Sequence, residues 1–214
     1  MGSLILPIFF SGGTEEKVFE LKEGLKFINV DIEYLKALHE SCSEVRYREK
    51  GYDNKPFIGV LISKEDRNYV IPLSSAKDKH KTWKNAEHER YLIYEITNKS
   101  VMGPNDIWVE ETEDKVKHIL SVLDIKKMIP VKEGVYQKIN LNPQNDDSEE
   151  EKKYKDLLNK EYSFCLKIMN DVIDKANKIY EKQIKSGKIQ KFCCDFKMLE
   201  EICCAYEVQE EKTI

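Results

Sequence analysis

Two adjacent hydroxyl groups and a nearby ammonium group are the side chains in this sequence best suited to act on a phosphate ester. Ser74 and Ser75 end an apolar run, and Lys77 follows two residues later. A hydroxyl can donate a hydrogen bond to a non-bridging phosphate oxygen, and an ammonium group can offset the charge that develops there. Each such donor lowers a barrier by roughly 2 to 4 kcal/mol. These residues therefore predict a phosphodiester-binding strand end, although a Ser-Ser pair after a strand is more often part of an ordinary turn.

Cleavage of RNA without a metal would need only a few further groups around this strand end. The ribose 2′-hydroxyl is itself the nucleophile, so the protein supplies placement, charge stabilisation and a route for protons. Tyr52 and Lys55 lie in a polar loop just before the apolar run. Lys55, if desolvated beside Lys77, would have a lowered pKa and act as base or acid, and Tyr52 would orient the ribose or stack on a base. His80 titrates near neutrality and is a further candidate for proton transfer.

Basic side chains interspersed with an aromatic residue follow the strand end. The segment from Lys77 to Lys84 holds four lysines, a histidine and a tryptophan. This composition suits a groove that follows a nucleic-acid backbone and offers one stacking platform, although a charged run is commonly only a solvated loop. The candidate RNA contacts here and in the later basic clusters are Lys79, His80, Lys81, Trp83, Lys84, Lys126, Lys127, Lys185, Lys188 and Lys191.

Short strands are expected to position the hydroxyl groups. Residues 57–63 and 68–73 are rich in β-branched side chains, and the charged tetrapeptide between them predicts an antiparallel hairpin that ends at Ser74. Further strands are expected at residues 25–30, 91–97, 107–109, 128–131 and 135–139. Because helices do not alternate with these strands, the pattern favours an α+β fold with a small, strongly curved antiparallel sheet or barrel.

Helical spacing of apolar residues predicts three helices around this sheet. Asp31 is a suitable N-cap for the first, and Gly187 closes a long amphipathic helix over residues 152–186. Asp195 caps the last. We expect residues 1–24 to form an N-terminal extension, with a hairpin, that packs on the domain, and residues 25–214 to form a single domain.

Composition limits the classes of protein to which the chain can belong. The chain has 214 residues, 41% of them hydrophobic, which suits one domain, and a net charge of −4, so any affinity for RNA must come from local clusters of cations. The apolar run at residues 4–10 is too short to span a bilayer, which predicts a soluble, cytoplasmic protein. The six cysteines lack the usual spacing of zinc ligands and are expected to be core residues. We expect no metal and no cofactor.

Three blocks, in order, resemble the toxins of type III toxin-antitoxin systems, the ToxN/AbiQ family. The first is a hairpin ending in the Pro-Leu-Ser-Ser-x-Lys pattern at residues 57–80. The second is HILSVLDIKKMIPV at residues 118–131, and the third is a long helix followed by GKIQKFCCDFKMLEEICCAY at residues 187–206. The chain differs from the usual family pattern in residues 1–24, in a longer segment at residues 97–117 and in its mild acidity.

The resemblance implies a barrel like that of Kid/MazF toxins, elaborated by helices, and an endoribonuclease that leaves 2′,3′-cyclic phosphate and 5′-hydroxyl ends. It points to Ser74, Ser75, Lys77, Tyr52 and Lys55 as the catalytic positions. It further implies cellular RNA as substrate, inhibition by a small structured antitoxin RNA derived from a repeat, RNA-bridged rings and a role in phage defence by growth arrest. Two alternatives stay open: a Kid/MazF-like toxin with a protein antitoxin, and a non-catalytic RNA-binding module.

Overall fold

The computed structural model describes residues 19–22, 24–47, 57–64 and 67–208. The strands are β1 (Phe19–Glu20), β2 (Phe27–Val30), β3 (Phe57–Lys64), β4 (Arg67–Ser75), β5 (Ala86–Glu87), β6 (Arg90–Asn98), β7 (Trp108–Glu110), β8 (Lys115–Asp124), β9 (Ile129–Val131) and β10 (Tyr136–Lys138). The α-helices are α1 (Ile32–Ser41), α2 (Glu149–Ser186) and α3 (Phe196–Ala205), and the 3₁₀ helices are η1 (Asp78–Thr82), η2 (Lys99–Val101) and η3 (Ile125–Lys127).

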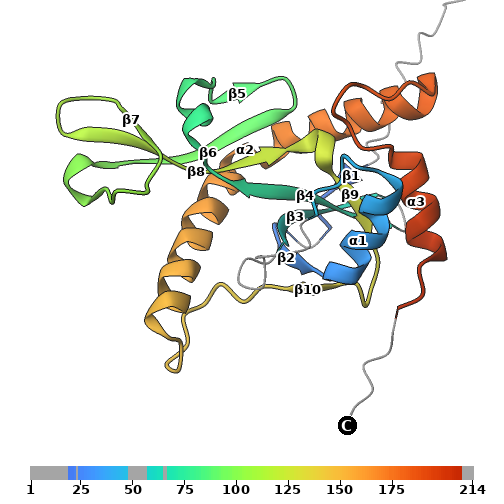
Figure 1. The fold of residues 1–214 in the computed structure, drawn as a ribbon, viewed down its shortest axis with the longest axis horizontal. Helices are drawn as coiled ribbons and strands as arrows, with labels where there is room; N and C mark the ends of the chain where they lie inside the picture. The colour runs from blue at the N-terminus through green and yellow to red at the C-terminus, as the bar shows by residue number, and fades with distance from the viewer. Residues whose placement is uncertain (1–18, 23, 48–56, 65–66, 209–214) are drawn as a thin grey trace, which may run out of the picture.

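Strand β4 is the central strand of the fold. One of its edges pairs with β3, which confirms the predicted hairpin. Its other edge pairs first with β9, at residues 68–70, and then with β8, at residues 73–75. The short helix η3 connects β8 to β9, so β4 runs from one half of the sheet into the other (Figure 1). Ser74 and Ser75 therefore lie in the second half, beside β8.

The described strand pairs are antiparallel, which confirms the expected sheet type. The strand order is β10-β2-β3-β4-β8-β6-β5, with β1 on β3, β9 on β4 and β7 on β8. In these pairings β10 and β5 lie at opposite edges, so the described strands form an open sheet, and closure into a barrel stays a prediction.

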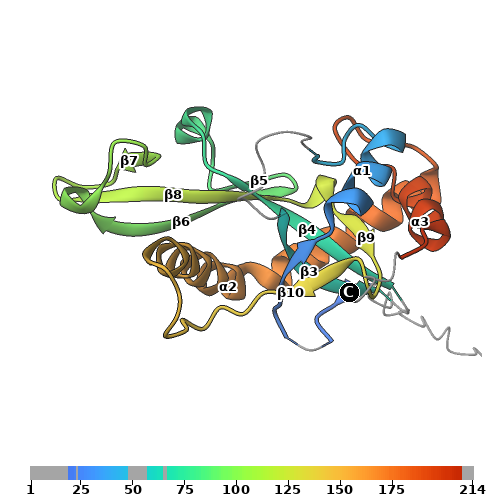
Figure 2. The same ribbon diagram turned by 60° about the horizontal axis from the view of Figure 1, so that its bottom comes forward.

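A long ribbon formed by β6 and β8 was only half predicted. The two strands pair from Arg90 and Asp124 to Asn98 and Lys115, and they extend beyond the rest of the sheet (Figures 1 and 2). The sequence predicted a strand at β6 but none at β8. The apolar run within β8 is buried on both faces and lacks the alternation that identifies a half-exposed strand.

The helices begin and end close to their predicted caps. Asp31 caps α1, and its carboxylate accepts a hydrogen bond from Tyr34 N at 2.9 Å. Helix α2 starts at Glu149, three residues earlier than predicted, because Ser148 is its N-cap. It ends at Ser186, and the Gly187 that follows is its C-cap, in a left-handed conformation. Helix α2 packs along one face of β6 and β8, whereas α1 and α3 lie together at the other end of the molecule (Figure 2).

Only the last residues of the predicted N-terminal extension belong to the described part of the chain. Phe19 is fully buried, and its backbone N–H donates to Asn177 of α2 at 2.6 Å. Strand β1 pairs with the end of β3. The strand and helix therefore fix residues 19 and 20 against the core, while the expected hairpin lies largely outside the described residues.

In the part of the chain that the structure describes, no helix is apolar over enough of its length to cross a bilayer.

Candidate functional site

The two candidate hydroxyl groups lie side by side along β4 but face opposite sides of the sheet. Ser75 is paired with Ser121 of β8, and Ser74 is paired with Val122. Successive side chains of a strand alternate between faces. Ser74 Oγ donates to Val122 O at 3.4 Å, whereas Ser75 is exposed. One bound phosphate can therefore contact Ser75 directly, while Ser74 lies on the face that is occupied by Trp83 and Val122.

Lys77 shares the side of Ser75. Ala76 N still donates to Leu120 O of β8, at 3.3 Å, so the strand path continues past Ser75. Lys77 itself is extended, with φ −143° and ψ 158°, and residues two apart in an extended chain face one way. Its ammonium group is exposed and forms no ion pair with any described residue. The arrangement leaves Lys77 available to an anion beside the Ser75 hydroxyl.

His80 lies beneath Lys77 instead of on the surface. Its side chain is buried, and Nδ1 accepts a hydrogen bond from Lys77 N at 3.0 Å, while His80 N donates to Lys77 O at 2.8 Å. Burial, aided by the charges of Lys79, Lys77, Arg46 and Arg90, lowers the pKa of His80 to about 4. The expectation that it titrates near neutrality is therefore wrong. At neutral pH it is an uncharged clamp on the Lys77 backbone.

Trp83 follows His80 and belongs to a small apolar cluster on the face of the sheet that carries Ser74. It packs against Leu92, Ile119 and Val122, and the Arg90 guanidinium lies 4.2 Å from the centre of its ring. The His80 ring is 4.5 Å away, centre to centre. The predicted stacking platform is thus partly buried in this cluster, which leaves less of the ring for a base.

Sequence reasoning missed a pair of arginines around a buried carboxylate. Arg46 forms an ion pair with Asp124 at 3.7 Å. Arg90 is the residue of β6 that lies opposite Asp124 of β8 in the strand register. Burial raises the pKa of Asp124, and the nearby cations Arg46, Lys127 and Arg90 oppose this rise. Asp124 Oδ1 has no hydrogen-bond partner among the described residues. Arg46 lies at the start of the polar segment that also holds Tyr52 and Lys55, but no local signal in the sequence links it to residue 124.

The predicted RNA-contacting lysines fall into three places. Near η1, Lys79 forms no ion pair with a described residue, while Lys81 and Lys84 pair with Asp78 and Glu87. On η3, Lys126 and Lys127 pair with Glu89 and Glu44. Lys185, Lys188 and Lys191 lie at and beyond the end of α2 and are exposed. Tyr52 and Lys55 lie outside the described residues, so their placement stays a prediction.

The sequence also matches a known protein family over most of its length. Residues 26–204 match the sequence model described as "Toxin ToxN, type III toxin-antitoxin system". The chain belongs to this ToxN toxin family. The match begins after the N-terminal extension and includes Ser74, Ser75, Lys77 and the long ribbon.

Individual relatives agree with the ToxN assignment. The chain is 27% identical over 197 residues to endoribonuclease ToxN of Bacillus thuringiensis subsp. kurstaki, covering 89% of this chain and 88% of the relative. It is 29% identical over 188 residues to endoribonuclease AbiQ of Lactococcus lactis subsp. lactis, covering 84% and 88%.

Solved structures share the fold. One structure describes inhibition of a type III toxin by a non-coding RNA pseudoknot; it superimposes with a TM-score of 0.59 at 26% identity and covers 86% of this chain and 99% of that chain. AbiQ, described as a lactococcal anti-phage endoribonuclease, superimposes with a TM-score of 0.57 at 24% identity, covering 85% and 97%. At that identity the second likeness shows the fold alone.

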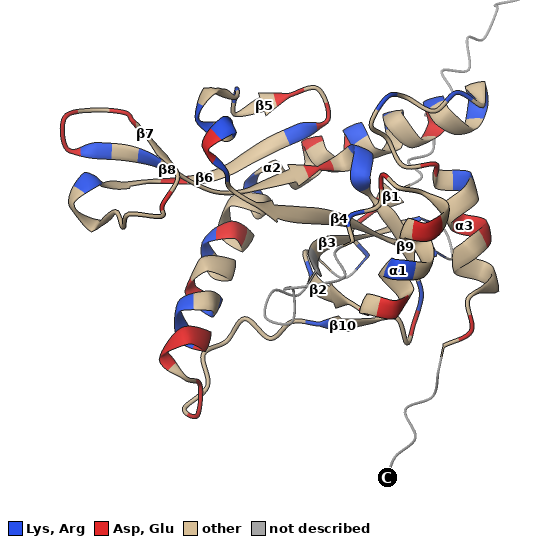
Figure 3. Ribbon diagram, in the orientation of Figure 1, with Lys and Arg blue, Asp and Glu red and all other residues tan. Residues whose placement is uncertain are grey.

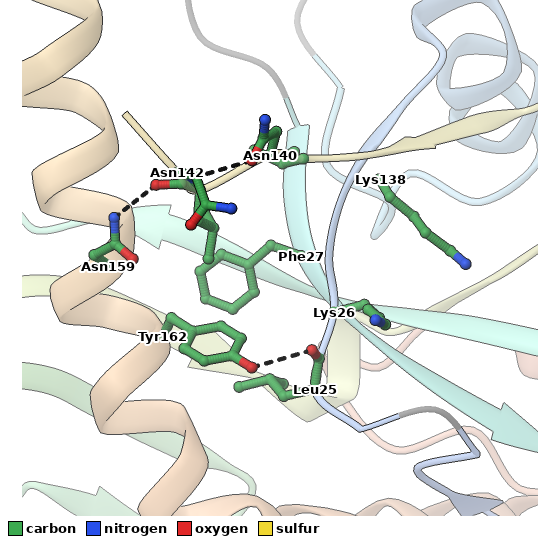
Figure 4. A pocket seen from close by; sticks show the side chains of 10 residues that line it. Leu25, Lys26, Phe27, Lys138, Asn140, Asn142, Asn159 and Tyr162 are labelled. Atoms are coloured by element: carbon green, nitrogen blue, oxygen red, sulfur yellow. Dashed lines mark hydrogen bonds between the residues drawn. The ribbon is translucent and has the colours of Figure 1, made fainter. Parts of the chain in front are cut away.

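A pocket of about 340 Å³ lies away from Ser75, where β2 and β10 meet α2. Its lining includes the Phe27 and Tyr162 rings and the Asn140, Asn142 and Asn159 amides (Figure 4). Asn159 Nδ2 donates to Leu141 O and Tyr162 Oη to Leu25 O, so several of these polar groups stabilise the wall itself.

Among the described residues, no group of three or more His, Cys, Asp or Glu side chains could hold a metal ion.

Proposed function

We propose that the chain is the toxin of a type III toxin-antitoxin system and an endoribonuclease that acts on cellular RNA. Membership of the ToxN family supports this proposal, together with an exposed Ser75 and an exposed Lys77 that forms no ion pair with a described residue. Relatives named endoribonuclease match along most of their length. The further proposal that the curved sheet resembles Kid/MazF barrels rests on the sequence resemblance.

In the proposed reaction, the ribose 2′-hydroxyl attacks the adjacent phosphorus and the bond to the 5′-oxygen breaks. The products are a 2′,3′-cyclic phosphate and a 5′-hydroxyl. Ser75 donates a hydrogen bond to a non-bridging oxygen, and Lys77 balances the charge that develops there. Neutral His80 holds the Lys77 backbone. Lys55 takes or returns a proton, Tyr52 orients the ribose, and no metal ion takes part.

A cleavage assay tests the chemistry. Replacement of one such hydrogen-bond donor, in Ser75→Ala, should lower kcat by roughly 10²- to 10³-fold. Ser100→Ala, at an exposed site in η2, is the matched control and should cleave like the unchanged protein. Product ends should accept label from polynucleotide kinase without prior dephosphorylation, and excess chelator should leave the rate unchanged. A rate that falls with chelator would argue against the mechanism.

We further propose that a small structured RNA, derived from a repeat, inhibits the toxin in the cytoplasm and that the pair acts in phage defence. Purification of the protein from its native operon should bring down one discrete small RNA. A short acidic protein in its place would favour a toxin with a protein antitoxin. Growth arrest that persists in Ser75→Ala would favour a non-catalytic RNA-binding module.

A further inference from the structure

The turn between α2 and α3 carries an aromatic residue in an unfavourable position. Cys193 N donates to Gln190 O at 3.1 Å and closes a four-residue turn, in which Phe192 occupies the third place. The φ of Phe192 is +63°, in the left-handed region, where glycine or asparagine is normally found. Its side chain is also 61% exposed. Both the backbone conformation and the exposure disfavour phenylalanine here.

Buried hydrogen bonds hold this turn in place. Gln183 of α2 is buried; its Oε1 accepts from Phe196 N at 2.7 Å, and its Nε2 donates to Cys194 O at 2.9 Å. Cys194 N in turn donates to Lys126 O of η3 at 2.9 Å. Because these bonds fix Cys194 and Phe196 to α2 and η3, the turn is held firmly on the side that follows Phe192. A strained residue that its surroundings hold in place is a common sign of function.

The surroundings of the Phe192 ring are cationic. Lys191 Nζ lies 4.8 Å from the ring centre, and Lys188, two residues before the turn, is exposed. Neither lysine forms an ion pair with a described residue. Single-stranded RNA is commonly bound by an aromatic ring that stacks on a base while nearby cations meet the phosphates. The Phe192 turn supplies both components on a rigid backbone.

We propose that residues 187–192 form a second RNA-contacting surface, on which Phe192 stacks on an unpaired base and Lys188 and Lys191 contact the flanking phosphates. This inference rests on the proposed function and adds a stacking residue that the basic clusters did not reveal. The turn adjoins η3, and η3 directly follows Asp124, which lies beside Arg46 and Arg90. An RNA strand bound at Phe192 therefore lies on the side of the molecule that also carries η3, next to Arg46 and Arg90.

Substitution by glycine separates binding from folding. Phe192→Gly removes the ring and suits the left-handed backbone, so its melting temperature should equal or exceed that of the unchanged protein. The binding probe is a fluorescein-labelled single-stranded 2′-O-methyl RNA, which lacks the free 2′-hydroxyl needed for cleavage. Fluorescence anisotropy should show roughly tenfold weaker binding for Phe192→Gly. Phe192→Trp should bind like the unchanged protein, because it keeps a stacking ring.

The salt dependence of binding distinguishes stacking from charge. Phe192→Gly should leave the slope of log Kd against log salt unchanged, whereas Lys188→Ala and Lys191→Ala should each reduce it by about 0.7. Equal binding by Phe192→Gly and the unchanged protein, in a preparation that cleaves RNA, would overturn this inference alone. A lower melting temperature for Phe192→Gly would overturn the strain argument. If the unchanged protein neither binds the probe nor cleaves RNA, the proposed function itself fails.

Discussion

At the scale of single residues, two buried glutamates show how neighbours decide the behaviour of a carboxylate. Glu161 of α2 is buried, and this desolvation raises its pKa to about 7, only partly offset by the hydroxyl of Ser121. Burial would raise the pKa of Glu200 too, but hydrogen bonds from Tyr69 and Tyr180 and the charge of Lys64 hold it below its ordinary value. The ionised carboxylate of Glu161 therefore destabilises the folded state, whereas that of Glu200 stabilises it.

Glu161→Gln should stabilise the protein at alkaline pH. Between the ordinary pKa of 4.5 and the folded value of about 7, folded Glu161 keeps a proton that the unfolded chain releases. Stability therefore falls as pH rises through this window, and the penalty is complete above it. Urea unfolding at pH 8 should show a gain of up to roughly 3 kcal/mol, and little change at pH 5. Glu150→Gln, exposed on the same helix, is the control; equal stability of Glu161→Gln and the unchanged protein at pH 8 would contradict the assignment.

At the scale of elements, periodicity predicted what depends on neighbours in sequence and missed what depends on distant contacts. The β3–β4 hairpin and the caps at Asp31 and Asp195 were predictable because turn chemistry and capping are local. Strand β8 was not, because it is enclosed by β4, β6 and α2 and its apolar run has no exposed face. The burial of His80 was hidden because its hydrogen bond from Lys77 and its ring contact with Trp83 give no periodic apolar pattern in the sequence.

Glu200 is the main polar contact between α3 and the rest of the fold. It accepts hydrogen bonds from Tyr69 of β4 and from Tyr180 of α2, the latter at 2.9 Å, and it forms ion pairs with Arg67 and Lys64. These residues come from three separate elements. The loss of this one carboxylate therefore weakens the attachment of α3 to both β4 and α2.

Glu200→Ala should lower the free energy of unfolding by about 3 kcal/mol, because it removes the shared acceptor of the Tyr69 and Tyr180 hydroxyls and the counter-ion of Lys64 and Arg67. Glu201→Ala changes the next residue of the same helix, which is exposed, and should have almost no effect. Chemical denaturation of both variants at neutral pH provides the comparison. Similar losses in the two variants would show that Glu200 contributes no more than a surface residue.

At the scale of the whole molecule, charge is distributed unevenly. The net charge is −4, yet lysines and arginines concentrate around η1, η3 and the end of α2. Acidic residues lie on the loop that links β7 and β8, at the far end of the ribbon, and on the first turn of α2 (Figure 3). Copies of the chain therefore repel one another overall, while each presents separate basic surfaces to a polyanion.

This distribution predicts that assembly depends on RNA. If one RNA contacts the strand-end site of one copy and a second basic surface of another, as the RNA-bridged rings expected from the sequence require, light scattering should give a mass that corresponds to several copies of protein and RNA. Digestion of the RNA should return the protein to single copies, because the net negative charge then opposes association. High salt should have the same effect, since the contacts are mainly between lysines and phosphates. Multimers that survive both treatments would show that contacts between protein chains, and not RNA, hold the assembly together.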